Sequence, residues 1–290
     1  MKLASVSSQG RNFPVVVVTD GFVDIGKHLT RAPDTLIGII RNWDSLASQL
    51  KELERKAPDG KLSAVTLEAP IARPGKIFAI GLNYADHCAE GNVPLPEKQV
   101  WFTKAATAVN APYAPLELPA VSKALDYEAE LVAVIGRTCR NVPESRFQEV
   151  IFGYCVGNDV SVRDWQLATP QWSLGKSFDR SAPIGPWITT ADAVDPHTLA
   201  IRSFVNGELR QNSNTQYLVF KLGAMIAHLS RAMTLEPGDL IFTGTPGGVG
   251  MVWQGTAHYL KPGDRSRIEI EELGAIEGVV EQGPHETIIA

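Results

Sequence analysis

The sequence predicts an α+β fold made mainly of strands, with a small α/β domain ahead of a larger one. After residue 70, short β-rich runs separated by Gly, Pro and Asn fill most of the chain. Only two segments in this part have a helical pattern, which is too few for a regular alternation of strands and helices. We therefore expect a small N-terminal domain over residues 1–70 and a larger domain over residues 71–290.

Residues 1–70 combine a β-branched run with a helical pattern. The four valines at 15–18 are typical of a buried strand. Asp34 is placed to cap an amphipathic helix, which we expect to break near Asn42. The helix is predicted from apolar residues that recur at three- and four-residue steps: Leu36, Ile40, Trp43, Ala47 and Leu50.

Residues 71–290 contain short apolar runs bounded by turn residues. Asn206-Gly207, between two such runs, is the strongest hairpin signal in the chain. Two segments are predicted to be helical, one after Pro143 and one from Thr215 to Met233. The predicted strands are Ile77 to Ile80, Leu131 to Ile135, Ile184 to Thr189, Ile201 to Val205, Leu240 to Thr243 and Ile268 to Ile270.

The composition limits the classes of partner. With 44% hydrophobic and 20% charged residues, the chain is typical of folded globular proteins. A net charge of −5 gives no broad basic field for nucleic acid or an anionic membrane, and no signal peptide or run of eighteen apolar residues is present. Three scattered cysteines do not form a disulfide framework or a zinc motif. We expect a small-molecule ligand, no nucleic-acid or membrane partner, and a cytoplasmic location.

An acidic cluster precedes one predicted strand. Asp126, Glu128 and Glu130 alternate along the chain just before the apolar run 131–135. Residues two apart in a strand point to the same face, so the three carboxylates would project together and repel one another. A divalent ion would offset that repulsion if the strand is buried. The alternative is an edge strand whose acids face water.

A further acid lies in an apolar, glycine-containing run. Asp159 follows residues 152–158 rather than a charged stretch, although an Asp that caps a turn is the alternative. Together with Glu128 and Glu130, it would complete a site of three carboxylates. Oxygen ligands favour Mg²⁺, Mn²⁺ or Ca²⁺ over zinc or copper, because no His or Cys nearby has a matching spacing.

His87 and Glu90 lie three residues apart in a short helical turn and would be neighbours on one face. A carboxylate beside an imidazole orients it and stabilises its charged form, as a general base requires. The alternative is a surface pair on a loop.

Two cations lie further along the chain. Arg163 and Lys176 are either solvated or would hold an anionic substrate. The glycine-rich stretch 243–250 lacks the P-loop and dinucleotide signatures, which leaves a close backbone approach to a ligand or a tight turn as its explanations.

These motifs, in this order, resemble those of the fumarylacetoacetate hydrolase family over about residues 71–280. The resemblance implies a catalytic domain folded as a mixed β-sandwich or roll, usually dimeric, that binds Mg²⁺, Mn²⁺ or Ca²⁺. It also implies that Glu128, Glu130 and Asp159 are the metal ligands. The matching stretches are Gly81 to Tyr84 with His87 and Glu90, Asp126 to Leu131, Asn158 to Asp164, Gly175 to Asp179, Leu235 to Asp239 and Thr243 to Pro246.

The resemblance also assigns catalytic and substrate-binding roles. His87 with Glu90 matches a water-activating dyad on a lid segment that orders with substrate, and Lys176 matches a lysine that stabilises an enolate or oxyanion. One departure is Ala105-Ala106, where many relatives carry prolines, and it bears on the shape of that loop. The first 70 residues only loosely resemble the N-terminal domain of longer bacterial members. The positions that match substrate contacts are Arg163, Gln166 and Thr245.

These roles predict hydrolysis of a carbon–carbon bond in a small anionic 1,3-diketo acid, such as an acylpyruvate, a fumarylpyruvate-like acid or a 2,4-diketo sugar acid. His87 would take a proton from the attacking water, and a pyruvate-type enolate would leave. The same site also suits an oxaloacetate-type decarboxylase or a 2-oxo acid hydratase or isomerase. Outside enzymes, the alternative is a metal-dependent binding protein. A homodimer is expected.

Overall fold

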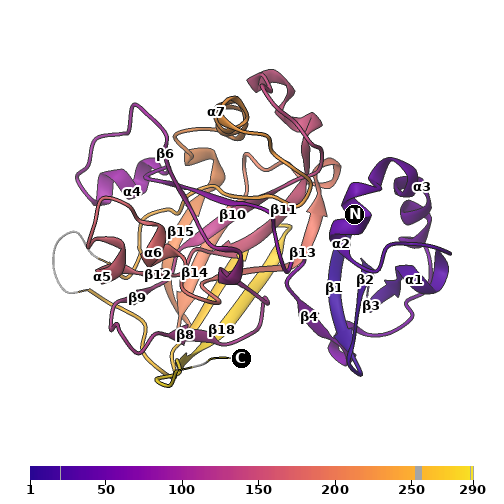
Figure 1. Ribbon diagram of the computed structural model, residues 1–290, viewed down its shortest axis with the longest axis horizontal. Helices are drawn as coiled ribbons and strands as arrows, with labels where there is room; N and C mark the ends of the chain where they lie inside the picture. The colour runs from indigo at the N-terminus through magenta and orange to yellow at the C-terminus, as the bar shows by residue number, and fades with distance from the viewer. Residues whose placement is uncertain (20, 252–256, 288, 290) are drawn as a thin grey trace.

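The computed structural model describes residues 1–19, 21–251, 257–287 and 289, which form two large β-sheets flanked by helices (Figure 1). One sheet has eleven strands and the other five, and a short pair, β9 (Leu125–Asp126) and β12 (Ser161–Val162), stands apart. The predicted α+β class made mainly of strands is confirmed. No helix among these residues is both long and apolar enough to cross a membrane.

The N-terminal strands extend the eleven-stranded sheet and do not form a sheet of their own. β1 (Lys2–Ser8) pairs with β2 (Arg11–Val18), and its first residues also pair with β13 (Ala182–Thr190). β2 pairs with β3 (Gly21–Asp24), and β4 (Thr66–Glu68) pairs with β1. The division of the chain at residue 70 stays a prediction.

Three helices accompany these strands: α1 (Ile25–His28), α2 (Leu36–Arg41) and α3 (Trp43–Leu53). The predicted break is confirmed, because Asn42 separates α2 from α3. The predicted cap is wrong. Thr35, not Asp34, has the extended conformation of an N-cap, and its hydroxyl accepts a hydrogen bond from the Gly38 N–H at 3.2 Å.

Four of the six predicted strands lie in the eleven-stranded sheet, as β5, β10, β13 and β16. Its order is β3-β2-β1-β13-β11-β10-β16-β5-β6, with β4 beside β1 and β7 beside β13. The paired strands β10 and β11 follow one another in the chain, whereas β1 and β13, and also β10 and β16, are far apart in the sequence. Their bounds are β5 (Ile77–Gly81), β6 (Val100–Thr103), β7 (Val109–Asn110), β10 (Ala129–Ile135), β11 (Ile151–Asn158) and β16 (Leu240–Phe242).

The five-stranded sheet contains the predicted hairpin. Asn206 and Gly207 join β14 to β15 with φ angles of 52° and 82°, the left-handed conformation that favours these two residues in a tight hairpin turn. The strands follow the order β15-β14-β17-β18-β8. Their bounds are β8 (Leu116–Leu118), β14 (Ala200–Val205), β15 (Glu208–Asn214), β17 (Arg265–Ile270) and β18 (Gly274–Gln282).

The central strand β10 is covered on both faces, because every residue from 129 to 135 is buried. Leu131 belongs to the core that includes Ile268 of β17, whereas its neighbour Val132 belongs to a second core that includes Ile40 of α2. This is the period-two alternation of a strand. It places β10 between the five-stranded sheet on one side and apolar residues of the N-terminal part on the other.

The two helices predicted in residues 71–290 differ in extent or type from those in the structure. The helix expected over 215–233 begins only at Leu222 as α7 (Leu222–Ala232), because Val219 and Phe220 donate backbone hydrogen bonds to Asn83 instead. The segment after Pro143 is a 3₁₀ helix, η3 (Glu144–Glu149). The other short helices are η1 (Leu62–Ala64), α4 (Ala85–Glu90), η2 (Ala106–Ala108), α5 (Arg163–Gln166), α6 (Ser173–Lys176), η4 (Ala191–Ala193) and η5 (Thr215–Tyr217).

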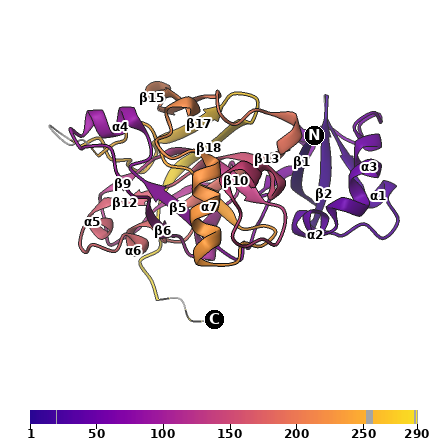
Figure 2. The same cartoon turned by 90° about the horizontal axis from the view of Figure 1, so that it is seen from above.

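The N-terminal part and the short helices α4, α5 and α6 lie at opposite ends of the molecule. Figures 1 and 2, seen at right angles to each other, agree on this placement. The strands β9 and β12 lie with α4 to α6. His87 and Glu90 lie on α4, Arg163 and Gln166 on α5, and Lys176 on α6, so these predicted site residues belong to this end.

Candidate active site

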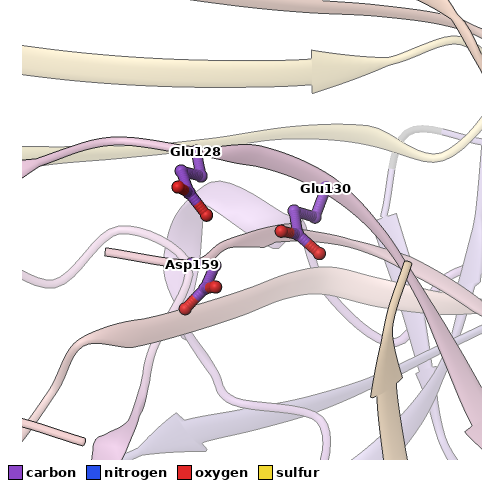
Figure 3. A group of neighbouring side chains, drawn as sticks. All are labelled: Glu128, Glu130 and Asp159. Atoms are coloured by element: carbon purple, nitrogen blue, oxygen red, sulfur yellow. The ribbon is translucent and has the colours of Figure 1, made fainter. Parts of the chain in front are cut away.

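Three carboxylates meet where two central strands end. Glu130 is near the start of β10, Glu128 precedes it, and Asp159 follows the end of β11, so the antiparallel pairing of β10 with β11 brings them together. One oxygen from each lies within 4.8 Å of the others, and Figure 3 shows the carboxylates pointing toward one another. All three residues are buried, so the alternative of a solvated edge strand is wrong.

Two of the three carboxylates are paired with buried cations. Lys176 Nζ lies 2.7 Å from Glu128 Oε2 and 2.7 Å from Asp159 Oδ2. Lys104 Nζ lies 2.7 Å from Asp159 Oδ1, and Arg163 Nη2 lies 2.6 Å from Glu128 Oε1. Burial would raise the pKa of Glu128, but the charges of Lys176 and Arg163 lower it to about 2. Glu128 is therefore ionised at neutral pH.

Glu130 differs from the other two. It accepts a hydrogen bond from the Gly244 N–H at 2.7 Å, but none of the cations that the structure describes lies within ion-pair distance of it. Burial, with the nearby charges of Asp159 and Glu128, raises the pKa of Glu130 well above its usual value. A divalent cation would supply the missing counter-charge, and three carboxylates are oxygen donors that such a cation prefers.

The charge balance of the cluster also fits a divalent cation. When all groups are ionised, four negative charges face three positive ones and leave one negative charge. A divalent cation would turn this into one positive charge, which favours an anionic ligand. The four acids are Asp126, Glu128, Glu130 and Asp159, and the cations are Lys104, Arg163 and Lys176.

Asp126 lies outside the carboxylate triad, because the chain leaves the strand conformation between β9 and β10. Its Oδ2 atom is 2.8 Å from both Nε and Nη2 of Arg163. The backbone N–H groups of Tyr127, Gly250 and Met251 also donate hydrogen bonds to it. Asp126 therefore holds Arg163 in place, which the alternating acidic pattern did not predict.

The glycine-rich stretch 243–250 binds side chains of this site through its backbone. The N–H of Gly244 donates to Glu130, and the N–H of Gly248 donates to Glu90 at 3.0 Å. Gly244 has a φ of 95°, and a Cβ there would come within 2.8 Å of Asn83 Cβ, so the loop needs glycine at this position. The stretch positions acidic side chains of the site.

His87 and Glu90 lie on α4, as the spacing predicts. His87 Nδ1 is 3.8 Å from Glu90 Oε2, within ion-pair distance, and this nearby imidazole keeps the pKa of Glu90 below its usual value. His87 is buried and Glu90 is exposed by 41% of its side chain, so the pair is only partly at the surface. Asp86 anchors the same helix by accepting a hydrogen bond from the Ser213 hydroxyl on β15.

The three expected substrate contacts are engaged with protein groups. Arg163 Nη1 donates to Gln166 Oε1 at 2.8 Å, and both residues are buried on α5. Thr245 Oγ1 accepts a hydrogen bond from Gln211 Nε2 at 2.7 Å. Arg163 thus sits inside the charged cluster, whereas Thr245 lies next to Gly244, the residue that binds Glu130.

Sequence reasoning missed two buried polar residues at the site. Lys104 follows strand β6, and its position after an apolar run was the only signal of burial. Gln211 lies in a strand with no other motif, so nothing in its neighbourhood distinguished it. Both matter because they contact Asp159 and Thr245, respectively.

Comparison with known proteins gives a consistent set of relatives. The family described as "Fumarylacetoacetate (FAA) hydrolase C-terminal" matches residues 76–281, more than half of the chain. A mitochondrial oxaloacetate tautomerase of Bos taurus is 42% identical over 260 residues, which cover 88% of this chain and 82% of that protein.

Solved structures of other proteins superpose on nearly the whole chain. Maleylpyruvate hydrolase from Sphingobium sp. SYK-6, in complex with manganese(II) and pyruvate, superposes with a TM-score of 0.82 at 37% identity. The 5-carboxymethyl-2-hydroxymuconate delta-isomerase of Mycobacterium smegmatis gives 0.78 at 34% identity. Each alignment covers 98% of this chain and 100% of the other.

Proposed function

Because this chain belongs to the fumarylacetoacetate hydrolase family, we propose that it is a metal-dependent hydrolase of a carbon–carbon bond in a small 1,3-diketo acid. The observation that carries the proposal is the buried carboxylate of Glu130, which has no cationic partner among the described residues, whereas Glu128 and Asp159 are paired. The maleylpyruvate hydrolase of similar structure, determined with manganese(II) and pyruvate, supports the same chemistry.

In this proposal Glu128, Glu130 and Asp159 hold Mg²⁺ or Mn²⁺, with Ca²⁺ as a further candidate. The bound cation would polarise the oxygens of a 2-oxo acid and stabilise enolate charge. Lys176, buried between two of the ligands, adds a fixed positive charge where the enolate forms. Arg163, Gln166 and Thr245 are the proposed substrate contacts, and Arg163 also holds Gln166 and Glu128 in place.

His87 is the proposed general base. Oriented by Glu90, it takes a proton from water, and the resulting hydroxide adds to the distal carbonyl of the substrate. The carbon–carbon bond then breaks, its electron pair stays on the pyruvate-type fragment as an enolate, and the other fragment leaves as a carboxylic acid. The enolate finally takes up a proton, so that water is the only other reactant.

A second candidate is isomerisation or decarboxylation of a 2-oxo acid such as oxaloacetate. The identity to an oxaloacetate tautomerase and the structural similarity to a delta-isomerase favour it. These reactions also pass through an enolate, but they do not require water to attack a carbonyl. The attack by water, seen in the products that form, therefore separates the two candidates.

The test is to assay the purified protein, with Mg²⁺ or Mn²⁺, against acylpyruvates, 2,4-diketo sugar acids and oxaloacetate. We expect hydrolysis of at least one diketo acid, lost with EDTA, and a fall of at least about 100-fold in His87→Ala. His228→Ala, which changes an exposed histidine on α7, is the matched control. Oxaloacetate tautomerisation or decarboxylation without any diketo acid hydrolysis would favour the second candidate instead.

We also propose that the protein is a cytoplasmic homodimer. The unpaired state of Cys88, Cys139 and Cys155 agrees with a reducing compartment. Light scattering after size-exclusion chromatography is expected to give twice the chain mass of 31.5 kDa. A mass equal to that of one chain would contradict the dimer.

A further inference from the structure

Gln211 is a fully buried amide on β15 that links the carboxylate strand to the loop of Thr245. Its Oε1 atom accepts a hydrogen bond from the Ala129 N–H at 3.0 Å. Its Nε2 atom donates to Thr245 Oγ1 at 2.7 Å and to the Pro246 carbonyl at 2.8 Å. Both amide hydrogens are therefore used.

These partners determine which way the amide points. The Ala129 N–H can only donate and the Pro246 carbonyl can only accept. A reversed amide would place donor against donor and acceptor against acceptor, which would cost two hydrogen bonds in a site without water access. Gln211 Nε2 therefore donates to the Thr245 hydroxyl, and the reverse does not occur.

The direction of this bond determines what the Thr245 hydroxyl can offer. A hydroxyl has one proton, and because Thr245 Oγ1 accepts from Gln211, its own proton is left to donate elsewhere. Within the part of the chain that the structure describes, no hydrogen bond from this proton is formed. The adjacent Gly244 N–H binds Glu130, so the backbone that carries Thr245 passes beside the carboxylate cluster.

We infer that Gln211 is a positioning residue that fixes the Thr245 hydroxyl as a hydrogen-bond donor to an anionic oxygen of the substrate. The inference rests on the proposed function, which places Thr245 against the substrate. A donor fixed in this way suits the carboxylate of a 2-oxo acid. It discriminates against a substrate that places a hydrogen-bond donor at this point, because the Thr245 hydroxyl proton would then have no acceptor.

Gln211→Glu tests the inference with little change in shape. A glutamate keeps an acceptor for the Ala129 N–H but accepts from the Thr245 hydroxyl, so it turns the Thr245 proton away from the substrate. In manganese-loaded protein, calorimetry is expected to show a ten- to hundred-fold weaker affinity for pyruvate, on the order of one hydrogen bond to a charged group. Manganese affinity is titrated alongside, so that pyruvate affinity is compared only between manganese-loaded proteins.

A double-mutant cycle separates this role from a structural one. Thr245→Val removes the hydroxyl, so adding Gln211→Glu in that background is expected to change pyruvate affinity by no more than about twofold. An equal loss in both backgrounds, or no loss in either, would overturn the inference alone. Failure of the parent to bind manganese or pyruvate would overturn the proposed function and the inference with it.

Two further variants keep the test decisive. Gln216→Glu adds the same charge at an exposed position shortly after β15, and it is expected to bind pyruvate like the parent. Gln211→Met removes the bond to Thr245 without adding charge, and it replaces Gln211→Glu if that protein does not fold. It is expected to show the same dependence on the Thr245 hydroxyl, and a loss that persists in Thr245→Val would contradict the inference.

Discussion

Glu130→Gln is expected to abolish binding of a divalent cation and to lower turnover by more than about a thousandfold, as loss of several kcal/mol of charge stabilisation implies. Glutamine has nearly the same size and can still accept a hydrogen bond from the Gly244 N–H. It carries no negative charge, so only the other two carboxylates of the triad would remain to hold the cation. Titration with Mn²⁺, followed calorimetrically, measures the binding, and a steady-state assay with a diketo acid measures the turnover.

The fold of this variant is expected to be intact. Glu130 is a buried carboxylate without a cationic partner among the described residues, so a neutral amide relieves unfavourable burial. The apo variant should therefore unfold in urea at or above the concentration that unfolds the apo parent. Glu97→Gln, at an exposed position, is the control. Parental manganese affinity in Glu130→Gln would exclude Glu130 as a ligand.

Lys104→Met is expected to lower the free energy of unfolding by about 3–5 kcal/mol in the absence of a divalent cation. The Lys104 side chain is fully buried, and its ammonium group lies 2.7 Å from Asp159 Oδ1 and 3.2 Å from the Val160 carbonyl oxygen. Methionine fills similar space but leaves the carboxylates with one fewer counter-charge. Urea unfolding in EDTA measures the loss.

Manganese should restore part of the stability that Lys104→Met loses. A cation that binds only the folded state adds stability as its concentration exceeds the dissociation constant, and here it also replaces missing positive charge. Lys98→Met, at an exposed position with no ion pair among the described residues, should be neutral in both conditions. A stability within about 1 kcal/mol of the parent in EDTA would show that Lys104 is not needed to balance Asp159.

The strand content and the hairpin could be predicted because their signals are local. Alternating or continuous apolar runs mark β10 and β11, and Asn206-Gly207 adopts the left-handed angles that such a turn needs. The start of α7 could not be predicted in this way. Residues 219 and 220 bond to Asn83, which lies more than a hundred residues earlier, and this long-range contact overrides the helical pattern.

In the candidate site, too, the residues with a local sequence signal could be predicted and those that depend on long-range contacts could not. Glu128, Glu130 and Asp159 were found because acids stand out against apolar strands, and antiparallel pairing then accounts for their meeting. Lys104 and Gln211 carry no such contrast, because their importance comes from partners on other strands.

The pairing of β1 with β13 bears on the behaviour of residues 71–290 expressed alone. Leu3 lies opposite Ile188 and covers one outer edge of β13, a strand whose residues are almost all buried. A chain that starts near residue 71 would leave that edge with open backbone donors and acceptors and no charged side chains to block another chain. We therefore expect a chain without the N-terminal strands to self-associate through this edge of β13, whatever role those strands have in chemistry.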